Sequence, residues 1–149
     1  MQEVIKKNFS EHLDVINKVL GSNSDSIDLF GNLLTTCLEN DGTIFWCGNG
    51  GSASDSQHIS AELVGRFKKD RRALRSIALT TDTSILTSVG NDYGFEEIFS
   101  RQFEALGTSR DILVGISTSG NSENIIRAFK AAKGLGALTL LLTGKDGGK

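Results

Sequence analysis

Short, almost wholly apolar runs that alternate with helix-like segments constrain the fold of this chain more than any other feature. A run of this kind is typical of a strand that is buried on both faces, as in parallel sheets covered by helices. Such runs occupy residues 43–47, 74–79, 111–116 and 137–142. We therefore predict an α/β fold, with a parallel sheet between two layers of helices.

Two amphipathic helices are predicted before the first strand. Apolar residues recur at helical spacing over residues 5–20 and again over 27–38, and residues 21–24 separate the two patterns. The same periodicity predicts helices over 53–67 and over 95–106. A further helix is predicted to follow residue 122 and to end at about residue 133. In the helix over 53–67 we expect a buried stripe, formed by Ile59, Leu63, Val64 and Phe67.

Composition excludes several classes of protein. The chain has 149 residues and a formal net charge of −2, which suits one domain and argues against binding nucleic acid through bulk positive charge. No apolar run reaches the roughly 18 residues that a membrane helix needs. The first residues lack the apolar core of a signal peptide, and Cys37 and Cys47 suit free thiols in a reducing cytosol. We predict a cytoplasmic protein.

The loop after the first predicted strand carries glycines at positions 48, 50 and 51. Gly48, Gly50 and Ala53 formally fit a dinucleotide-binding fingerprint, but the acidic residue expected at the end of the second strand is absent, which disfavours a nicotinamide cofactor. The loop is either a tight turn or a place where backbone amides approach a polar ligand at a helix N-terminus. We favour the second interpretation.

The helix that follows has a polar face formed by Asp55, His58, Glu62 and Arg66, at spacings of three and four. His58 and Glu62 can converge on one atom, so they could bind a metal together or move a proton between two carbons. The alternative is a solvated face with ordinary ion pairs. Ser52 and Asp55 are also expected to form a capping box.

The segment Ser117–Ser122 has four hydroxyls and one glycine between a strand and a helix. Amides, hydroxyls and a helix dipole together can bind phosphate, and we favour that interpretation. The alternative is a set of side-chain turns with a helix cap at Asn121 or Ser122. Residues 91–94 alone would indicate a plain turn.

These segments together resemble the phosphoheptose isomerase family of the sugar isomerase (SIS) domain superfamily. The resemblance runs in order along nearly the whole chain. It rests on the motifs at residues 47–52, 57–63, 78–84, 90–95, 115–122 and 143–148.

The resemblance implies a flavodoxin-like sheet and N-terminal helices that build a homotetramer, with active sites at subunit contacts. It implies conversion of sedoheptulose 7-phosphate to D-glycero-D-manno-heptose 7-phosphate through an enediol, the first step toward the activated heptose of bacterial surface glycans. It assigns Glu62 as the catalytic base, and His58 with Glu62 as ligands of one Zn²⁺ per subunit. The substrate contacts that it implies are Asn49, Gly50, Gly51, Glu62, Asn91, Asp92, Ser117, Thr118, Ser119 and Ser122.

We interpret residues 1–149 as a single SIS domain. In the family, a later strand and helix supply a glutamine and a second histidine that complete the metal site. The chain ends at Lys149, after a segment that is typical of a strand-to-helix loop. We therefore expect that the C-terminal strand and helix are missing and that the remaining zinc ligands belong to them.

Three other functions compete with the isomerase. The first is a non-catalytic SIS-domain tetramer that assists the DnaA replication initiator. Such relatives tend to lack a glutamate at the position of Glu62 and to diverge at residues 91–94, and both features are intact here. A phosphosugar-sensing regulator would usually carry a fused DNA-binding region. An oxidoreductase would need the absent ribose-binding acid.

Overall fold

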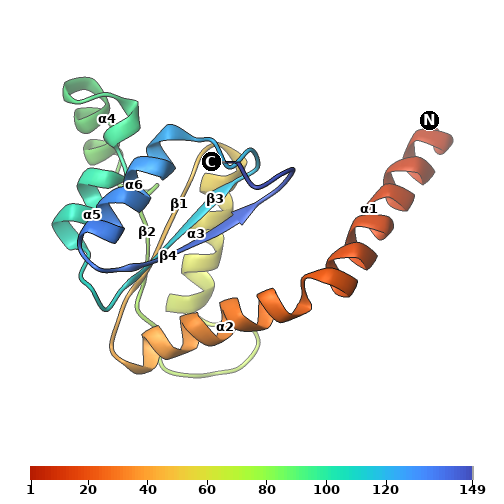
Figure 1. Cartoon of the computed structure of the whole chain (residues 1–149), viewed down its shortest axis with the longest axis horizontal. Coiled ribbons are helices and arrows are strands. Elements are labelled where there is room, and N and C mark those ends of the chain that lie inside the picture. The colour runs from red at the N-terminus through yellow and green to blue at the C-terminus, as the bar shows by residue number, and fades with distance from the viewer. Residues whose placement is uncertain (149) are drawn as a thin grey trace. The chain divides into compact units, whose positions relative to one another are not determined.

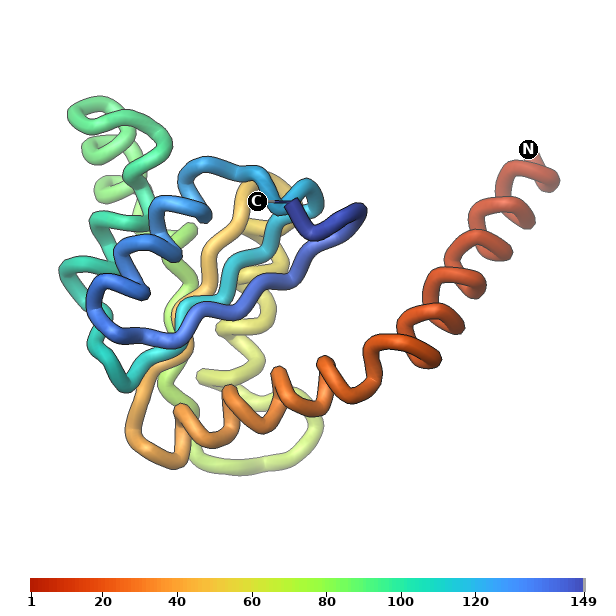
Figure 2. Tube along the Cα trace, in the orientation of Figure 1, coloured from red at the N-terminus to blue at the C-terminus, as the bar shows by residue number. Residues whose placement is uncertain are grey.

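The computed structural model describes residues 1–148. The chain forms two compact units, one from Met1 to Thr35 and the other from Thr36 onward. Figure 2 traces the chain through both units. The second unit contains the sheet and every predicted site residue.

The sheet has four parallel strands in the order β2-β1-β3-β4 (Figure 1). In β1, Ile44 pairs with Ser76 of β2 on one side and with Ile112 of β3 on the other. This order confirms the predicted α/β fold and follows the flavodoxin-like pattern. The strands are β1 (Ile44–Gly48), β2 (Ser76–Ala78), β3 (Ile112–Ser117) and β4 (Leu138–Thr143).

The helices of the second unit cover both faces of the sheet. Helix α3 lies on one face, and α5 and α6 pack together on the other (Figure 1). The predicted helix over 95–106 is wrong as one element, because a short 3-10 turn and a separate helix occupy that segment. The helical elements are α3 (Gly51–Val64), α4 (Thr83–Asp92), η1 (Phe95–Glu97), α5 (Ser100–Leu106) and α6 (Glu123–Gly134).

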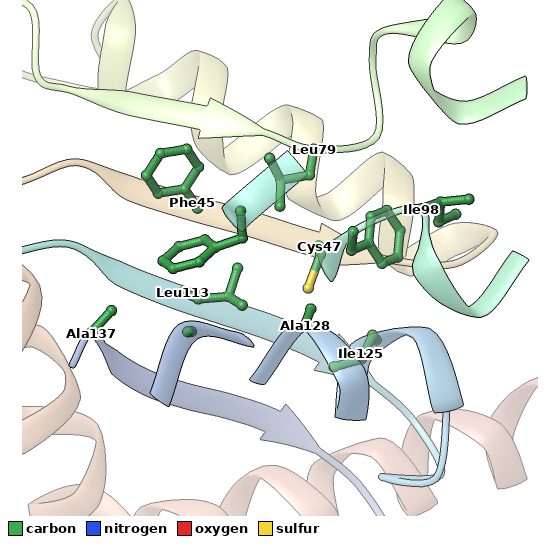
Figure 3. Close-up of a cluster of buried hydrophobic side chains, with 11 residues drawn as sticks. Phe45, Cys47, Leu79, Ile98, Leu113, Ile125, Ala128 and Ala137 are labelled. Carbon is green, nitrogen blue, oxygen red and sulfur yellow. The ribbon is translucent and has the colours of Figure 1, made fainter. Parts of the chain in front are cut away.

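The face toward α5 and α6 is an apolar core (Figure 3). Phe45 and Cys47 of β1 and Leu113 of β3 point into it, each at most 2% exposed. The ring of Phe103 from α5 packs edge-to-face on Phe45, with 5.1 Å between the ring centroids. Ala128 of α6 is fully buried, and so small a side chain lets the helix lie close to the strands.

The face toward α3 is built differently. The helix buries Ser56 and Ser60, and a chain of hydrogen bonds runs from the Trp46 indole to the Ser76 hydroxyl (2.9 Å) and from there to the Ser60 hydroxyl (3.1 Å). Small polar residues let α3 approach the sheet closely while every buried hydroxyl in this chain of bonds keeps a partner.

The predicted buried stripe of this helix is therefore wrong in part. Val64 is 48% exposed and Phe67, beyond the helix end, is 70% exposed. The predicted capping box is also absent, because Ser52 lies inside α3 and the N-cap residue, Gly50, offers no side chain. The serines took the buried positions because the helix approaches too closely for large side chains.

The N-terminal unit consists of α1 (Gln2–Ser22) and the start of α2 (Ser24–Glu39). The predicted break between the two helices is confirmed at Asn23. No residue of α1 is buried, and its apolar stripe is open, with Phe9 68% exposed. In α2 the buried residue is Cys37, whereas Ile27 is 57% exposed.

Candidate functional site

The site lies where the connections diverge in an open parallel sheet. Strands β1 and β3 are neighbours, but β1 leads to α3 on one face and β3 leads to α6 on the other. Ligands of such sheets bind in the crevice outside the carboxyl ends of the strands at this point. The glycine loop after β1 and the hydroxyl loop after β3 both lie there.

The glycine loop brings backbone to the head of α3. A Cβ at Gly48 would lie 2.5 Å from the Ser52 carbonyl oxygen, so the tight turn requires glycine. Gly50 has a φ of +55° and is the N-cap of α3 without a side-chain cap. The first backbone N–H groups of α3 therefore donate to no capping side chain. Gly51 has no side chain that could shield them from a ligand.

The hydroxyl loop gathers its side chains around the start of α6. The hydroxyls of Ser117 and Ser122 lie 3.1 Å apart, and the Ser119 hydroxyl accepts a bond from the Asn121 N–H (3.2 Å). Ser122 is the N-cap of α6 but makes no side-chain cap bond, which weakens the interpretation of its hydroxyl as a cap. Thr118 is exposed beside them.

A cavity of about 460 Å³ lies beside both loops. Asn49 and Ser122 line it, and these are residues that the sequence indicated. It also contains residues that sequence reasoning missed. They are Phe95, Glu96, Glu123, Asn124 and Arg127.

Arg127 is the cation of this cavity, and three carboxylates engage it. Its guanidinium donates to Glu97 and to Glu123 (3.1 Å) and lies 3.9 Å from Glu96. The Ser100 hydroxyl and then Arg127 hold the pKa of the Glu97 carboxyl below its usual value. The i,i+4 spacing of Glu123 and Arg127 was the sequence signal for part of this cluster.

The polar face of α3 carries the proton-transfer candidates. His58 Nε2 lies 3.3 Å from Glu62 Oε1, and the Glu62 side chain is half-buried while that of His58 is 75% exposed. Both line a second cavity, of about 320 Å³, with the apolar side chains of Leu63 and Phe67. Arg71 also lines this cavity, and its guanidinium donates to the carbonyls of residues 62 and 63 at 2.8 and 2.9 Å, which caps the C-terminal end of α3.

Asn91 and Asp92 end α4, where the Asn91 amide donates to the Asp92 carboxylate (2.8 Å). No hydrogen bond among residues 1–148 joins this pair to either loop. The structure thus brings Asn49 together with Ser122 and places the His58–Glu62 and Asn91–Asp92 pairs as separate groups.

Metal ligands are incomplete within the described part of the chain. No cluster of three or more His, Cys, Asp and Glu residues occurs in residues 1–148. His58 and Glu62 are nitrogen and oxygen donors of the kind that zinc accepts, and they could supply two of the three protein ligands of an ordinary catalytic site. Over the same residues, no helix combines the length and apolar character needed to span a membrane.

Comparison with known proteins agrees with this geometry. The sequence matches the SIS domain family over residues 8–144. The phosphoheptose isomerase of Helicobacter pylori (strain P12) is 52% identical over 149 residues, which are 100% of this chain and 78% of that protein. The phosphoheptose isomerase of Aquifex aeolicus (strain VF5) is 54% identical with the same two coverages.

Solved structures give the same result. Phosphoheptose isomerase GmhA from Neisseria gonorrhoeae superposes with a TM-score of 0.92 at 47% identity, over 99% of this chain and 77% of that one. A phosphoheptose isomerase from Francisella tularensis gives a TM-score of 0.94 at 38% identity, over 98% and 76%. The chain therefore belongs to the phosphoheptose isomerase family of SIS domain proteins.

Proposed function

We propose that this chain, an aldose–ketose isomerase by its family, uses Glu62 to convert sedoheptulose 7-phosphate to D-glycero-D-manno-heptose 7-phosphate. The reaction serves the biosynthesis of activated heptose. The observation that supports this proposal most is a half-buried carboxylate on α3, the helix that begins at the divergence of β1 and β3. Glu62 itself lies near the C-terminal end of α3, apart from the hydroxyl loop, whose chemistry suits a sugar phosphate. The proposal therefore has the two groups meet at a subunit contact.

The phosphate is proposed to bind Ser117, Thr118, Ser119 and Ser122. Hydroxyl donors at the N-terminus of a 12-residue helix supply hydrogen bonds and a favourable dipole for an anion. Arg127 adds little net positive charge, because three carboxylates surround it. Affinity therefore comes from the hydroxyls, the loop amides and the helix.

The sugar is proposed to contact the glycine loop and the end of α4. Asn49, Gly50 and Gly51 offer an amide and backbone N–H groups, and Asn91 and Asp92 offer an amide and a carboxylate. Such groups suit the hydroxyls of a sugar chain, which both donate and accept hydrogen bonds.

Glu62 is proposed to carry the proton between the two carbons. Its carboxylate takes a proton from C1 of the ketose while O2 gains a proton, which gives the enediol. The carboxylic acid then returns the proton to C2, and O1 loses its proton to leave the aldehyde. The electron pair released from the C1–H bond ends in the new C2–H bond, so the step needs no nicotinamide.

His58 and Glu62 are further proposed as ligands of one Zn²⁺ per subunit. A bound Zn²⁺ would supply a Lewis acid for the substrate oxygens. The 3.3 Å separation of their donor atoms suits joint ligation by two residues one helical turn apart.

A homotetramer with active sites at subunit contacts is also part of the proposal. The open apolar stripe of α1, with Leu13 59% exposed and Leu20 70% exposed, supports it, because apolar stripes of this kind are normally covered. Cys37 and Cys47 are free thiols, which supports a cytoplasmic location. The non-catalytic, DnaA-assisting alternative is not favoured, because the matching relatives are named as isomerases.

The variant Glu62→Gln tests the proposal, since it keeps the size and polarity of the side chain but removes the base. We expect turnover of sedoheptulose 7-phosphate to fall at least about a hundredfold, the usual lower range for general-base catalysis. The melting temperature and the binding of an unreactive analogue should stay near parent values. Glu104→Gln, an exposed change on α5, is the matched control. Near-parent turnover in Glu62→Gln would remove Glu62 from the mechanism.

A further inference from the structure

The side chains of Asn49 and Asn124 form a reciprocal amide pair. Asn49 Nδ2 donates to Asn124 Oδ1 at 3.0 Å, and Asn124 Nδ2 donates to Asn49 Oδ1 at 2.8 Å. The two residues are 75 positions apart in sequence. Asn49 belongs to the glycine loop and Asn124 to the first turn of α6, so the pair joins the two loops of the site directly.

The two members of the pair differ in exposure. Both line the cavity of about 460 Å³, but Asn124 is 3% exposed, whereas Asn49 is half-buried. A primary amide has two N–H donors and an oxygen with two lone pairs, and the pair uses one donor and one lone pair of each. Asn49 therefore keeps one N–H and one lone pair for a ligand, while the Asn124 side chain is largely withdrawn from solvent.

We propose that Asn124 is a positioning residue, which fixes the rotamer of Asn49 and holds the glycine loop at a set distance from the hydroxyl loop. It acts on the substrate only through Asn49. The amide pair resists rotation, because turning either side chain by 180° would place N–H against N–H and oxygen against oxygen. This inference rests on the proposed function, since it deepens the role of the same site.

A double-mutant cycle on the full chain tests the proposal. We expect Asn124→Ala to lower kcat/KM for sedoheptulose 7-phosphate about tenfold, as the loss of two neutral hydrogen bonds implies. If Asn124 acts through Asn49, the double variant Asn49→Ala with Asn124→Ala should be no slower than Asn49→Ala alone. Effects that multiply would overturn the proposal, and so would an Asn124→Ala variant with parent kinetics.

Asn124→Asp is the conservative variant, and it keeps the test decisive if the alanine variant fails to fold. Its carboxylate can accept from Asn49 but cannot donate back. Its protonated form restores the donor, so the ratio of its kcat/KM to that of the parent should rise as pH falls toward the carboxyl pKa. A ratio that is independent of pH would contradict the reciprocal pair.

A readout that does not need turnover separates this proposal from the proposed function. In the parent, the side-chain N–H of Asn49 that donates to Asn124 should exchange slowly with solvent, and Asn124→Ala, which removes its acceptor, should speed that exchange. If the parent shows slow exchange but does not turn over sedoheptulose 7-phosphate, the amide pair is supported and the proposed function is contradicted. Fast exchange in the parent would overturn the amide pair whatever the activity.

Discussion

The face of the sheet that carries Phe45 and the face that carries Trp46 pack against their helices in different ways. Toward α5 and α6 the contact is apolar, with Phe99 and Phe103 at most 1% exposed. Toward α3 the contact runs through buried serines and the hydrogen-bonded Trp46 indole. The two faces lie on one set of strands, so the difference comes from the alternating strand side chains and from the helix that packs on each face.

The difference relates to what each helix carries. Helix α3 presents Glu62 and His58, and its close, polar contact with the sheet fixes the direction of that helix through hydrogen bonds. Helix α6 presents Ser122 at its N-terminus and is held by apolar packing along its length. The apolar face thus supplies stability under the hydroxyl loop, and the polar face supplies orientation to the proposed base.

The largest effect is expected at Cys47, on the apolar face. Burial raises the pKa of its thiol to about 12 from 9.0, so the thiolate fraction near pH 8 is about a thousandfold smaller than for a free cysteine. In a Cys37→Ser background, Cys47 should react with a thiol reagent only after unfolding by denaturant. Rapid reaction in the folded protein would mean that Cys47 is accessible to solvent, against its burial on this face.

The same raised pKa predicts a direction for stability against pH. The unfolded chain loses the Cys47 proton near pH 9, while the folded chain keeps it until about pH 12. Below pH 9 the neutral thiol makes its full contribution to stability, and the contribution declines as pH rises from 9 to 12. Replacing Cys47 by Ala should flatten this decline in the unfolding free energy.

Phe103→Ala should cost about 3–5 kcal/mol of unfolding free energy, because it removes a fully buried ring from the apolar core. Leu106→Ala on the same helix is the control, since Leu106 is 53% exposed and its loss should cost far less. Denaturant unfolding measures both. Equal costs would contradict the distinction between the core and the surface of α5.

The double change Ser119→Ala with Ser122→Ala should raise KM for the sugar phosphate at least about tenfold, because each bond to a charged group contributes roughly 1.5–3 kcal/mol. The turnover number should fall less, because a phosphate far from the reacting carbons binds about equally well in the ground state and in the transition state. Inorganic phosphate should compete less well in the variant. A lower melting temperature with unchanged KM and unchanged phosphate inhibition would identify Ser122 as a helix cap instead.

Ser60→Ala should give the smallest effect, about 1 kcal/mol of unfolding free energy, from the partner that the Ser76 hydroxyl loses. The exposed Ser54→Ala change on the same helix is the control. The ratio of kcat to KM should fall as well if the polar contact orients α3. If kcat/KM is unchanged in Ser60→Ala, the polar contact between α3 and the sheet contributes to stability but not to the orientation of Glu62.

Much of the fold was predictable from the sequence, because buried parallel strands leave an unmistakable apolar pattern. The four runs matched β1 to β4 within two residues at each end, with the largest shift at the start of β2. The hydroxyl loop and the His58–Glu62 pair were also visible, since they depend on local spacing.

Interactions between distant segments were not predictable. The burial of Ser56 and Ser60 instead of Val64 and Phe67 depends on how closely α3 approaches the sheet, and no local pattern encodes that distance. The Asn49–Asn124 pair likewise joins residues that only the strand order brings together.

The most direct test of the central claim is to incubate the protein with sedoheptulose 7-phosphate in D₂O, without nicotinamide, and follow the products by NMR. We expect an aldose 7-phosphate that carries deuterium at C2, because the Glu62 carboxyl exchanges its proton with solvent during the enediol step. The Glu62→Gln variant should form neither the aldose nor the deuterated product. Absence of the aldose with the folded parent protein, or an aldose wholly free of deuterium, would contradict an isomerase that works through Glu62 and an enediol.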